Sequence, residues 1–209
     1  MIKKLFWKNI NTPNLVLRNY DKFVNKFNCN YVWKCNENII KDLYKSNISK
    51  NHLEIGPGTG YFLKSHLFNT LNLVDINKSH LNQSKKNLLL NTNKIFCYHN
   101  DIFNTDFKTQ LPPVSSVGLS YVLHCIDGRL DILLNNLINN VSQSNVIFFG
   151  STVLPIESNI IAKTELLFLN YFNIFNNYNH NFNDLSELKS KFDCDFKIIG
   201  NVLVFKIKT

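Results

Sequence analysis

One run of eleven residues organises this sequence: His52-Leu53-Glu54-Ile55-Gly56-Pro57-Gly58-Thr59-Gly60-Tyr61-Phe62. Its apolar start, 53–55, predicts a buried strand, and the aromatic, apolar run 61–68 predicts the first turns of a helix. Glycines at alternate positions join the two. A strand that turns through glycines into a helix brings backbone N–H groups close to a ligand, because no side chain holds the ligand away. The run therefore predicts a nucleotide-type site at the carboxyl end of a strand.

The spacing of the glycines distinguishes two kinds of nucleotide site. The dinucleotide-binding fingerprint is G-x-G-x-x-G, and here the third glycine comes one residue too early. Glu54 followed by Gly56, Gly58 and Gly60 instead resembles motif I of the class I S-adenosylmethionine (SAM)-dependent methyltransferases. In that family the loop wraps the methionine part of the cofactor, so the resemblance implies cofactor contacts from these residues and from Tyr61. An ordinary glycine turn is the alternative interpretation.

A second acidic residue follows the loop at a suitable distance. The run 71–75 predicts a buried strand that ends in Asp75, 19 residues after Gly56. A carboxylate there can accept hydrogen bonds from both ribose hydroxyls of an adenosine, and Ile76 would then lie against one adenine face. The alternative is a cap for a helix predicted at 78–90, with its leucines toward the sheet.

A third acidic residue follows the strand predicted at 94–99. In motif III of the family, an acidic side chain accepts from the adenine amino group and the next backbone N–H donates to the ring. The resemblance assigns these places to Asp101 and Ile102. A loop aspartate that stabilises a turn is the alternative.

The fourth predicted strand, 114–123, brings Ser120 and Tyr121 beside the transferred methyl group if the fold resembles the family. Amino methyltransferases carry an Asn/Asp-Pro-Pro-aromatic motif at this point, and this sequence does not. By its position, His124 is the candidate general base. Its alternatives are a helix cap and a packing histidine. The resemblance implies no metal.

The residues before the first predicted strand favour helices at 20–27 and 31–44, separated by a break at 28–30. Many small-molecule methyltransferases use such helices as a lid over cofactor and substrate, and aromatic residues such as Tyr20 and Trp33 recur there. Plain core packing explains the two aromatic residues equally well. We therefore predict a helical lid over 1–50 and a SAM-dependent methyltransferase domain over 51–209.

The carboxyl-terminal third completes the expected sheet. It predicts a helix at 130–141, a strand at 145–150, a long apolar helix at 158–175, a short helix at 184–192 and a hairpin of two strands joined by Gly200-Asn201. The predicted fold class is α/β: a Rossmann-like, seven-stranded, mostly parallel sheet with a carboxyl-terminal antiparallel hairpin, which is typical of class I methyltransferases. The aromatic residues of 168–182 suit an apolar or flat substrate, or form a satellite hydrophobic cluster.

Composition constrains the partners. The 209 residues carry a net charge of +8, but the lysines are scattered and form no arginine-rich stripe, so nucleic acid is an unlikely partner. Five widely spaced cysteines without a C-x-x-C pair indicate neither zinc nor a disulfide framework, and their odd number fits the reducing cytoplasm. No apolar run approaches the ~20 residues that span a bilayer.

We therefore predict an enzyme that transfers a methyl group from SAM to an oxygen or nitrogen of a small, apolar or aromatic molecule, with S-adenosylhomocysteine as product. Natural-product biosynthesis is the expected setting, and phenylalanine-rich surfaces could pair two copies as a homodimer. Two alternatives stay open. One is an RNA or protein methyltransferase, supported by charge alone, and the other is a SAM-fold protein without methyl transfer.

Overall fold

The computed structural model describes residues 21–209 apart from 93, 103–110, 142, 157–159 and 173. In this part of the chain seven strands form one sheet in the order β3-β2-β1-β4-β5-β7-β6. The strands are β1 (Asn51–Ile55), β2 (Thr70–Asp75), β3 (Ile95–His99), β4 (Ser116–Ser120), β5 (Ile147–Val153), β6 (Asp193–Ile199) and β7 (Val202–Lys208). Strands β1 to β5 run parallel and β7 is antiparallel to both of its neighbours. The predicted fold class is confirmed.

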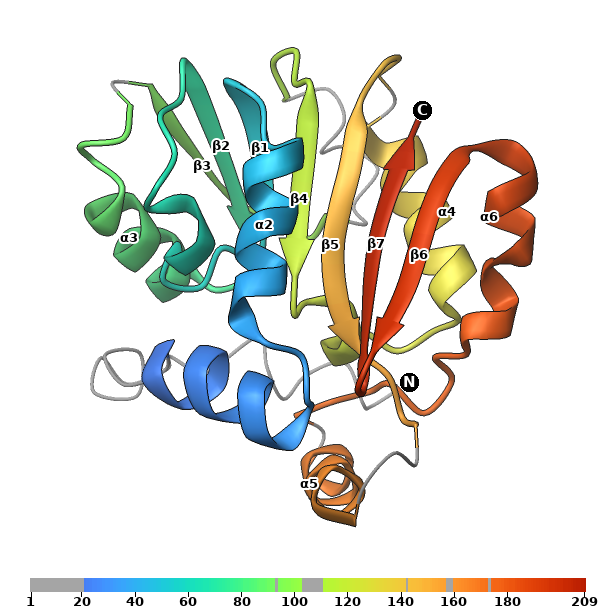
Figure 1. Ribbon diagram of the computed structural model, residues 1–209. Coiled ribbons are helices and arrows are strands. Elements are labelled where there is room, and N and C mark those ends of the chain that lie inside the picture. Colours follow the sequence, from blue (N-terminus) through green and yellow to red (C-terminus); the bar gives the residue numbers. More distant parts are fainter. Residues whose placement is uncertain (1–20, 93, 103–110, 142, 157–159, 173) are drawn as a thin grey trace.

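Helices cover both faces of the sheet (Figure 1). Helices α2 (Glu37–Asn47) and α3 (Lys78–Asn87) pack on one face, and α4 (Leu130–Val141) and α6 (Ser186–Lys191) pack on the other. Strand β1 contributes side chains to both faces of the sheet, because successive side chains of a strand point to opposite faces. Leu53 and Ile55 join the core around α4, whereas Glu54 reaches Tyr44 of α2.

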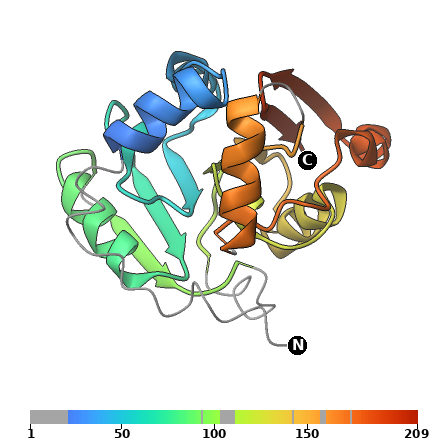
Figure 2. The same ribbon diagram turned by 90° about the horizontal axis from the view of Figure 1, so that it is seen from below.

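Two further helices lie beyond the carboxyl ends of the parallel strands (Figures 1 and 2). They are η2 (Asp21–Val32), a π-helix, and α5 (Ile160–Tyr171). Short 3₁₀ turns occupy Tyr61–Leu63 (η3), Leu123–Cys125 (η5) and Phe182–Leu185 (η6). The two helices therefore cap the edge of the sheet at which the glycine loop lies.

The predicted break at 28–30 is wrong, because η2 continues through these residues. The chain breaks after Val32 instead, where Lys34 adopts a left-handed φ of 53°. Asn36 then caps α2 by accepting a hydrogen bond from the N–H of Asn38. Asparagine disfavours a helix interior only weakly, whereas a left-handed residue ends a helix outright.

The predicted helix at 61–68 is also wrong, since only η3 forms there. The chain must return at once to start β2, and the N–H groups of Asn69 and Thr70 already bond to the carbonyl of Lys50. Helix α3 likewise ends at Asn87, before the predicted 90. Leu90 is consequently 96% exposed and does not face the sheet.

Other boundaries shifted by a few residues. Strand β4 is shorter than predicted because Tyr121 adopts a left-handed φ of 60° directly after it. Strand β5 is longer at its carboxyl end, α5 is shorter than the predicted 158–175, and the helix predicted at 184–192 is divided between η6 and α6.

The predicted hairpin is confirmed, with Gly200 and Asn201 as its turn. Gly200 has a φ of 57°, and a Cβ there would overlap the carbonyl oxygen of Trp33. The N–H of Asn201 donates to this same oxygen at 2.9 Å. The turn therefore supports the segment that links the cap to α2.

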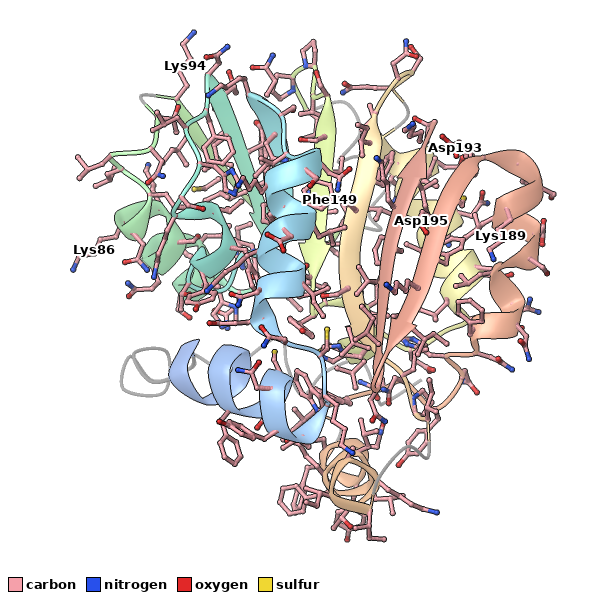
Figure 3. All side chains as sticks on the ribbon, viewed as in Figure 1. Lys86, Lys94, Phe149, Lys189, Asp193 and Asp195 are labelled. Carbon is pink, nitrogen blue, oxygen red and sulfur yellow. The ribbon has the colours of Figure 1, made fainter. Side chains whose placement is uncertain are left out.

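The lysines are distributed over the molecule. Lys86, Lys94 and Lys189 project from separate sides in Figure 3. None of the helices in the described ranges is long and apolar enough to cross a bilayer.

Candidate cofactor and acceptor site

A hollow lies between the glycine loop and the end of β4. Its lining brings together seven of the predicted cofactor residues with four of their neighbours: Glu54, Gly56, Gly58, Gly60, Tyr61, Ser120 and Tyr121, together with Pro57, Thr59, Phe62 and Leu63. The loop starts in register with the sheet, since the N–H of Gly56 bonds to the carbonyl of Val74 at 2.8 Å. The two ends of neighbouring parallel strands thus form one site, as the sequence predicts.

All three loop glycines adopt a left-handed φ: 62° at Gly56, 53° at Gly58 and 76° at Gly60. Side chains rarely adopt this conformation. A Cβ at Gly58 would meet nothing within 4 Å, whereas a Cβ at Gly56 would lie 2.6 Å from a methyl group of Val122. Gly58 therefore faces open space that a ligand could occupy, and Gly56 is needed for the packing of the loop.

The Glu54 carboxylate is fixed beneath the loop. Its Oε1 accepts from the Tyr44 hydroxyl at 2.6 Å, and its Oε2 lies 2.9 Å from Nε2 of His52. Glu54 is only 4% exposed, yet it contributes to the lining of the hollow. A carboxylate has about four lone-pair positions, so two contacts leave capacity for a ligand.

Ser120 and Tyr121 close the hollow from β4. The Ser120 Oγ is buried and has no hydrogen-bond partner among the described residues. Such an atom is costly unless something else satisfies it. The Tyr121 hydroxyl accepts from the thiol of Cys29 at 3.2 Å, and burial raises the pKa of Tyr121 well above its ordinary value. Tyr121 is therefore a neutral phenol that joins the hollow to the cap.

Tyr61 links the loop to α2. Its hydroxyl donates to Glu37 at 2.6 Å, and the ammonium group of Lys41 lies 5.4 Å from its ring centroid. Lys41 and Glu37 also form an ion pair at 3.0 Å. The ring thus lies over the loop at a position set by two charged residues.

Asp75 is the last residue of β2 and Ile76 follows it, and both lie outside the lining of the hollow. The Asp75 Oδ1 accepts from the N–H of Asn77 at 2.8 Å, and Oδ2 lies 3.2 Å from Nδ1 of His80. Asn77 caps α3, so the alternative prediction that Asp75 caps this helix is wrong. The Asp75 side chain is 8% exposed, and Ile76 is 39% exposed.

Asp101 and Ile102 lie at the end of β3, again outside the lining of the hollow. The N–H of Asn100 donates to the carbonyl of Asp75 at 3.2 Å, which holds the two strand ends together. The N–H of Asp101 bonds to the side chain of Asn100. Ile102 is 6% exposed, and its carbonyl accepts from Asn140.

Trp33 lies in the cap and not in the lining of the hollow. Its indole N–H donates to the Glu165 Oε2 of α5 at 2.7 Å, while Asn28 donates to Oε1 at 2.7 Å. Burial raises the pKa of Glu165, although both donors oppose this effect. The Trp33 ring packs on Tyr121, with 5.3 Å between centroids. Tyr20 lies outside the described residues.

His124 belongs to the same aromatic cluster. Its ring lies 4.0 Å from that of Phe175 and 6.3 Å from those of Trp33 and Tyr121. Its Nδ1 accepts from the N–H of Val153 at 3.4 Å. Burial, with a smaller contribution from the charge of His180, lowers the pKa of His124 to about 3. The imidazole is therefore neutral at physiological pH and a weak base.

Several site residues were not predicted. Tyr44, ten residues before Glu54, and Glu165, 132 residues after Trp33, contact predicted residues from helices, and no local pattern marks them. His52 stands in the quoted run itself, where it reads as one more strand residue. The available signal was a pair of polar residues two positions apart in the predicted strand, His52 and Glu54, because such side chains point to the same face of the sheet.

No known protein family profile matches the sequence. The chain is nevertheless similar to methyltransferase aurB of Calcarisporium arbuscula, with 28% identity over 92% of both chains. It is also 29% identical to the demethylluteothin O-methyltransferase of Streptomyces thioluteus, over 86% of this chain and 80% of that one.

A solved structure is similar to this chain in fold. The O-methyltransferase NcsB1 of neocarzinostatin biosynthesis, in complex with SAM and 2-hydroxy-5-methyl naphthoic acid, matches with a TM-score of 0.58 and 15% identity. The match covers 97% of this chain but 60% of that one. The predicted resemblance to the class I SAM-dependent methyltransferases is thereby confirmed.

Proposed function

We infer that this chain is a SAM-dependent methyltransferase of the small-molecule type, and we propose that it methylates a hydroxyl oxygen. The observation that carries the proposal is the left-handed glycine loop whose middle glycine, Gly58, faces open space beside the buried, unpartnered Ser120 Oγ. The two relatives described above are methyltransferases by name, and one of them is an O-methyltransferase.

The residues of the hollow fit the proposed cofactor. Glu54 and Ser120 would hold its amino-acid end, Gly56, Gly58 and Gly60 would let it approach the backbone, and Tyr61 would lie over it. Asp75 would bind the ribose by exchanging its contact with His80 for the sugar hydroxyls, with Ile76, Asp101 and Ile102 around the adenine. When bound, SAM would supply a methyl group on a positively charged sulfur: the acceptor oxygen would bond to the methyl carbon as the S–CH₃ bond breaks, S-adenosylhomocysteine would leave, and the hydroxyl proton would pass to His124 or to water.

We propose that the acceptor lies among the rings of Trp33, Tyr121, His124 and Phe175. These surfaces favour an apolar or aromatic acceptor. His124 stays the candidate base, although a pKa of about 3 makes it a weak one. The chain therefore works mainly by aligning the acceptor and excluding water, which can contribute about 7–11 kcal/mol.

Three further proposals concern organisation. Residues 1–50 act as a lid on the domain 51–209, supported by the contacts of η2 and Trp33 with α5 and the hairpin turn. Two copies pair through the apolar side of α5, where Phe168 is 58% exposed and Tyr171 is 79% exposed. The free thiols of Cys29 and Cys35 support a cytoplasmic location.

The direct test is calorimetric binding of SAM and S-adenosylhomocysteine to the wild-type protein and to Asp75→Ala. Micromolar binding by the wild type and its loss in Asp75→Ala are expected. Asp195→Ala is the matched control and should bind normally, because Asp195 (labelled in Figure 3) is an exposed carboxylate on the edge strand β6, which β5 and β7 separate from β4. Absence of binding by the wild type would end the proposal.

Turnover needs a second measurement. Transfer of a labelled methyl group from SAM should appear in the small-molecule fraction of a host extract. Label in the RNA or protein fraction would favour the alternative substrate classes. Binding without any transfer would favour a SAM-fold protein that does not methylate.

A further inference from the structure

A chain of polar groups lies buried under the glycine loop, on the face of the sheet that α2 covers. The register of the sheet builds it, because His52 pairs with Ser116 and Glu54 pairs with Gly118 across β1 and β4. His52 Nδ1 is 2.8 Å from the Ser116 Oγ, and its Nε2 is 2.9 Å from the Glu54 Oε2. A Cβ at Gly118 would overlap the Glu54 carboxylate, so the glycine makes room for it.

The surroundings of His52 are apolar. The residue is 0% exposed, and its ring stacks between Phe68 and Phe149, with centroids at 5.9 and 5.8 Å. Figure 3 labels Phe149 in the middle of the molecule. A polar ring without partners would be costly in such surroundings, so both ring nitrogens need a polar contact.

Counting hydrogens assigns the hydrogen on Nδ1 of His52. The single hydroxyl hydrogen of Ser49 is donated to the carbonyl of Asn51 at 2.8 Å, so the Ser49 Oγ accepts from Ser116 at 2.8 Å. Ser116 has then used its one hydrogen, and the contact with His52 needs a hydrogen on Nδ1. Nε2 of the ring and the Glu54 Oε2 share a hydrogen between them.

We propose that His52 is a positioning residue: its buried imidazole holds the Glu54 carboxyl group through the hydrogen between Nε2 and Oε2 and keeps this group directed at the primary ammonium group of the cofactor's amino-acid end. The inference rests on the proposed function. Glu54 reaches the hollow and is the acidic group of its lining. Without His52 its second oxygen would lose this partner, and a buried polar group without a partner is costly and no longer held in place.

Other charged and titratable groups complete the environment. Tyr44 faces the pair from α2 and donates to Glu54, and burial together with the Glu54 charge raises its pKa well above the ordinary value. His66 lies nearby, and its pKa is lowered by burial and then by the charges of His52 and Lys50. Tyr44 therefore stays a neutral donor to the Glu54 carboxyl group.

The test compares two ligands that differ only in the amino-acid end. S-adenosylhomocysteine has the ammonium group, and 5′-deoxy-5′-methylthioadenosine lacks the whole amino-acid part. In His52→Phe, which preserves the stacking, the dissociation constant of the first should rise about tenfold or more. That of the second should change less than about twofold. His52→Gln retains an N–H donor and should lose less.

Controls separate positioning from folding. Thermal melting of each variant reports stability, and Tyr98→Phe removes a hydrogen bond to Asn72 elsewhere in the sheet without touching Glu54. Equal weakening of both ligands in folded His52→Phe, or no weakening, would overturn the inference and leave the proposed function intact. A wild-type protein that binds neither ligand would overturn both.

Discussion

The sharpest expectation concerns Gly58→Ala. All three loop glycines are left-handed, but their surroundings differ. An added methyl group at Gly58 enters open space, whereas at Gly56 it would lie 2.6 Å from Val122 and at Gly60 2.9 Å from Leu88. If the cofactor occupies that open space, Gly58→Ala should damage binding far more than folding.

The magnitudes follow from the geometry. Alanine in a left-handed conformation costs about 1 kcal/mol, which for a domain of this size lowers Tm by about 2–4 °C. Gly56→Ala adds an overpacking cost of about 1–3 kcal/mol, so its Tm should fall clearly further. In binding, a similar steric cost at Gly58 corresponds to about 10- to 100-fold weaker affinity.

Thermal melting and calorimetry with S-adenosylhomocysteine measure the two effects separately. Gly128→Ala is the matched control, because it also places alanine at a positive φ (143°) and lies outside the lining of the hollow. It should lose some stability and no affinity. Wild-type affinity in Gly58→Ala would refute the idea that a ligand fills the space beside this glycine.

Two further predictions concern the cap. Glu165→Leu removes the acceptor shared by Trp33 and Asn28, and since this carboxylate is half-buried we expect a loss of about 1–2 kcal/mol, with faster amide exchange in η2 and α5. Glu165→Gln should retain most of the protection of the amide hydrogens from exchange. Equal exchange in both variants would contradict the idea that the hydrogen bonds to Glu165 hold η2 and α5 together. In the folded protein the pKa values of His124 and His180 are about 3 and about 4, below the ordinary ~6.5. Between these values the unfolded chain binds more protons than the folded one. The free energy of unfolding therefore falls as pH decreases from about 6.5 to 4. Burial of His124 accounts for roughly 3 kcal/mol of this fall, and urea unfolding of His124→Phe should show a flatter pH dependence; an unchanged slope would contradict the assignment.

The sheet was predictable because each strand carries its own signal. An apolar run bounded by polar residues identifies a buried strand, and Gly200-Asn201 between two β-rich runs fixes the hairpin. The helix after the glycine loop was not predictable from its apolar residues. The short distance from Tyr61 to the start of β2 leaves room for one 3₁₀ turn, and this limit depends on the position of Lys50, not on local preference.

The register between β1 and β4 explains why the buried chain of polar groups under the glycine loop could not be predicted. The sequence places His52 and Glu54 on one face of β1, but it does not say that Ser116 and Gly118 will be their neighbours on β4. Only the pairing of β1 with β4 turns two separate residues into a chain of hydrogen bonds. The role inferred for His52 therefore needs the three-dimensional structure.

The cofactor part and the proposed acceptor part of the site also differ in how far the sequence predicts them. The cofactor half is built largely from one continuous loop, so its residues can be read from the sequence. The proposed acceptor half is assembled from Trp33 in the cap, His124 after β4, and Glu165 and Phe175 in and after α5. Contacts between η2 and α5 set the spacing of these rings. Variation in the cap would therefore change the acceptor while the glycine loop, and with it the chemistry, stays the same.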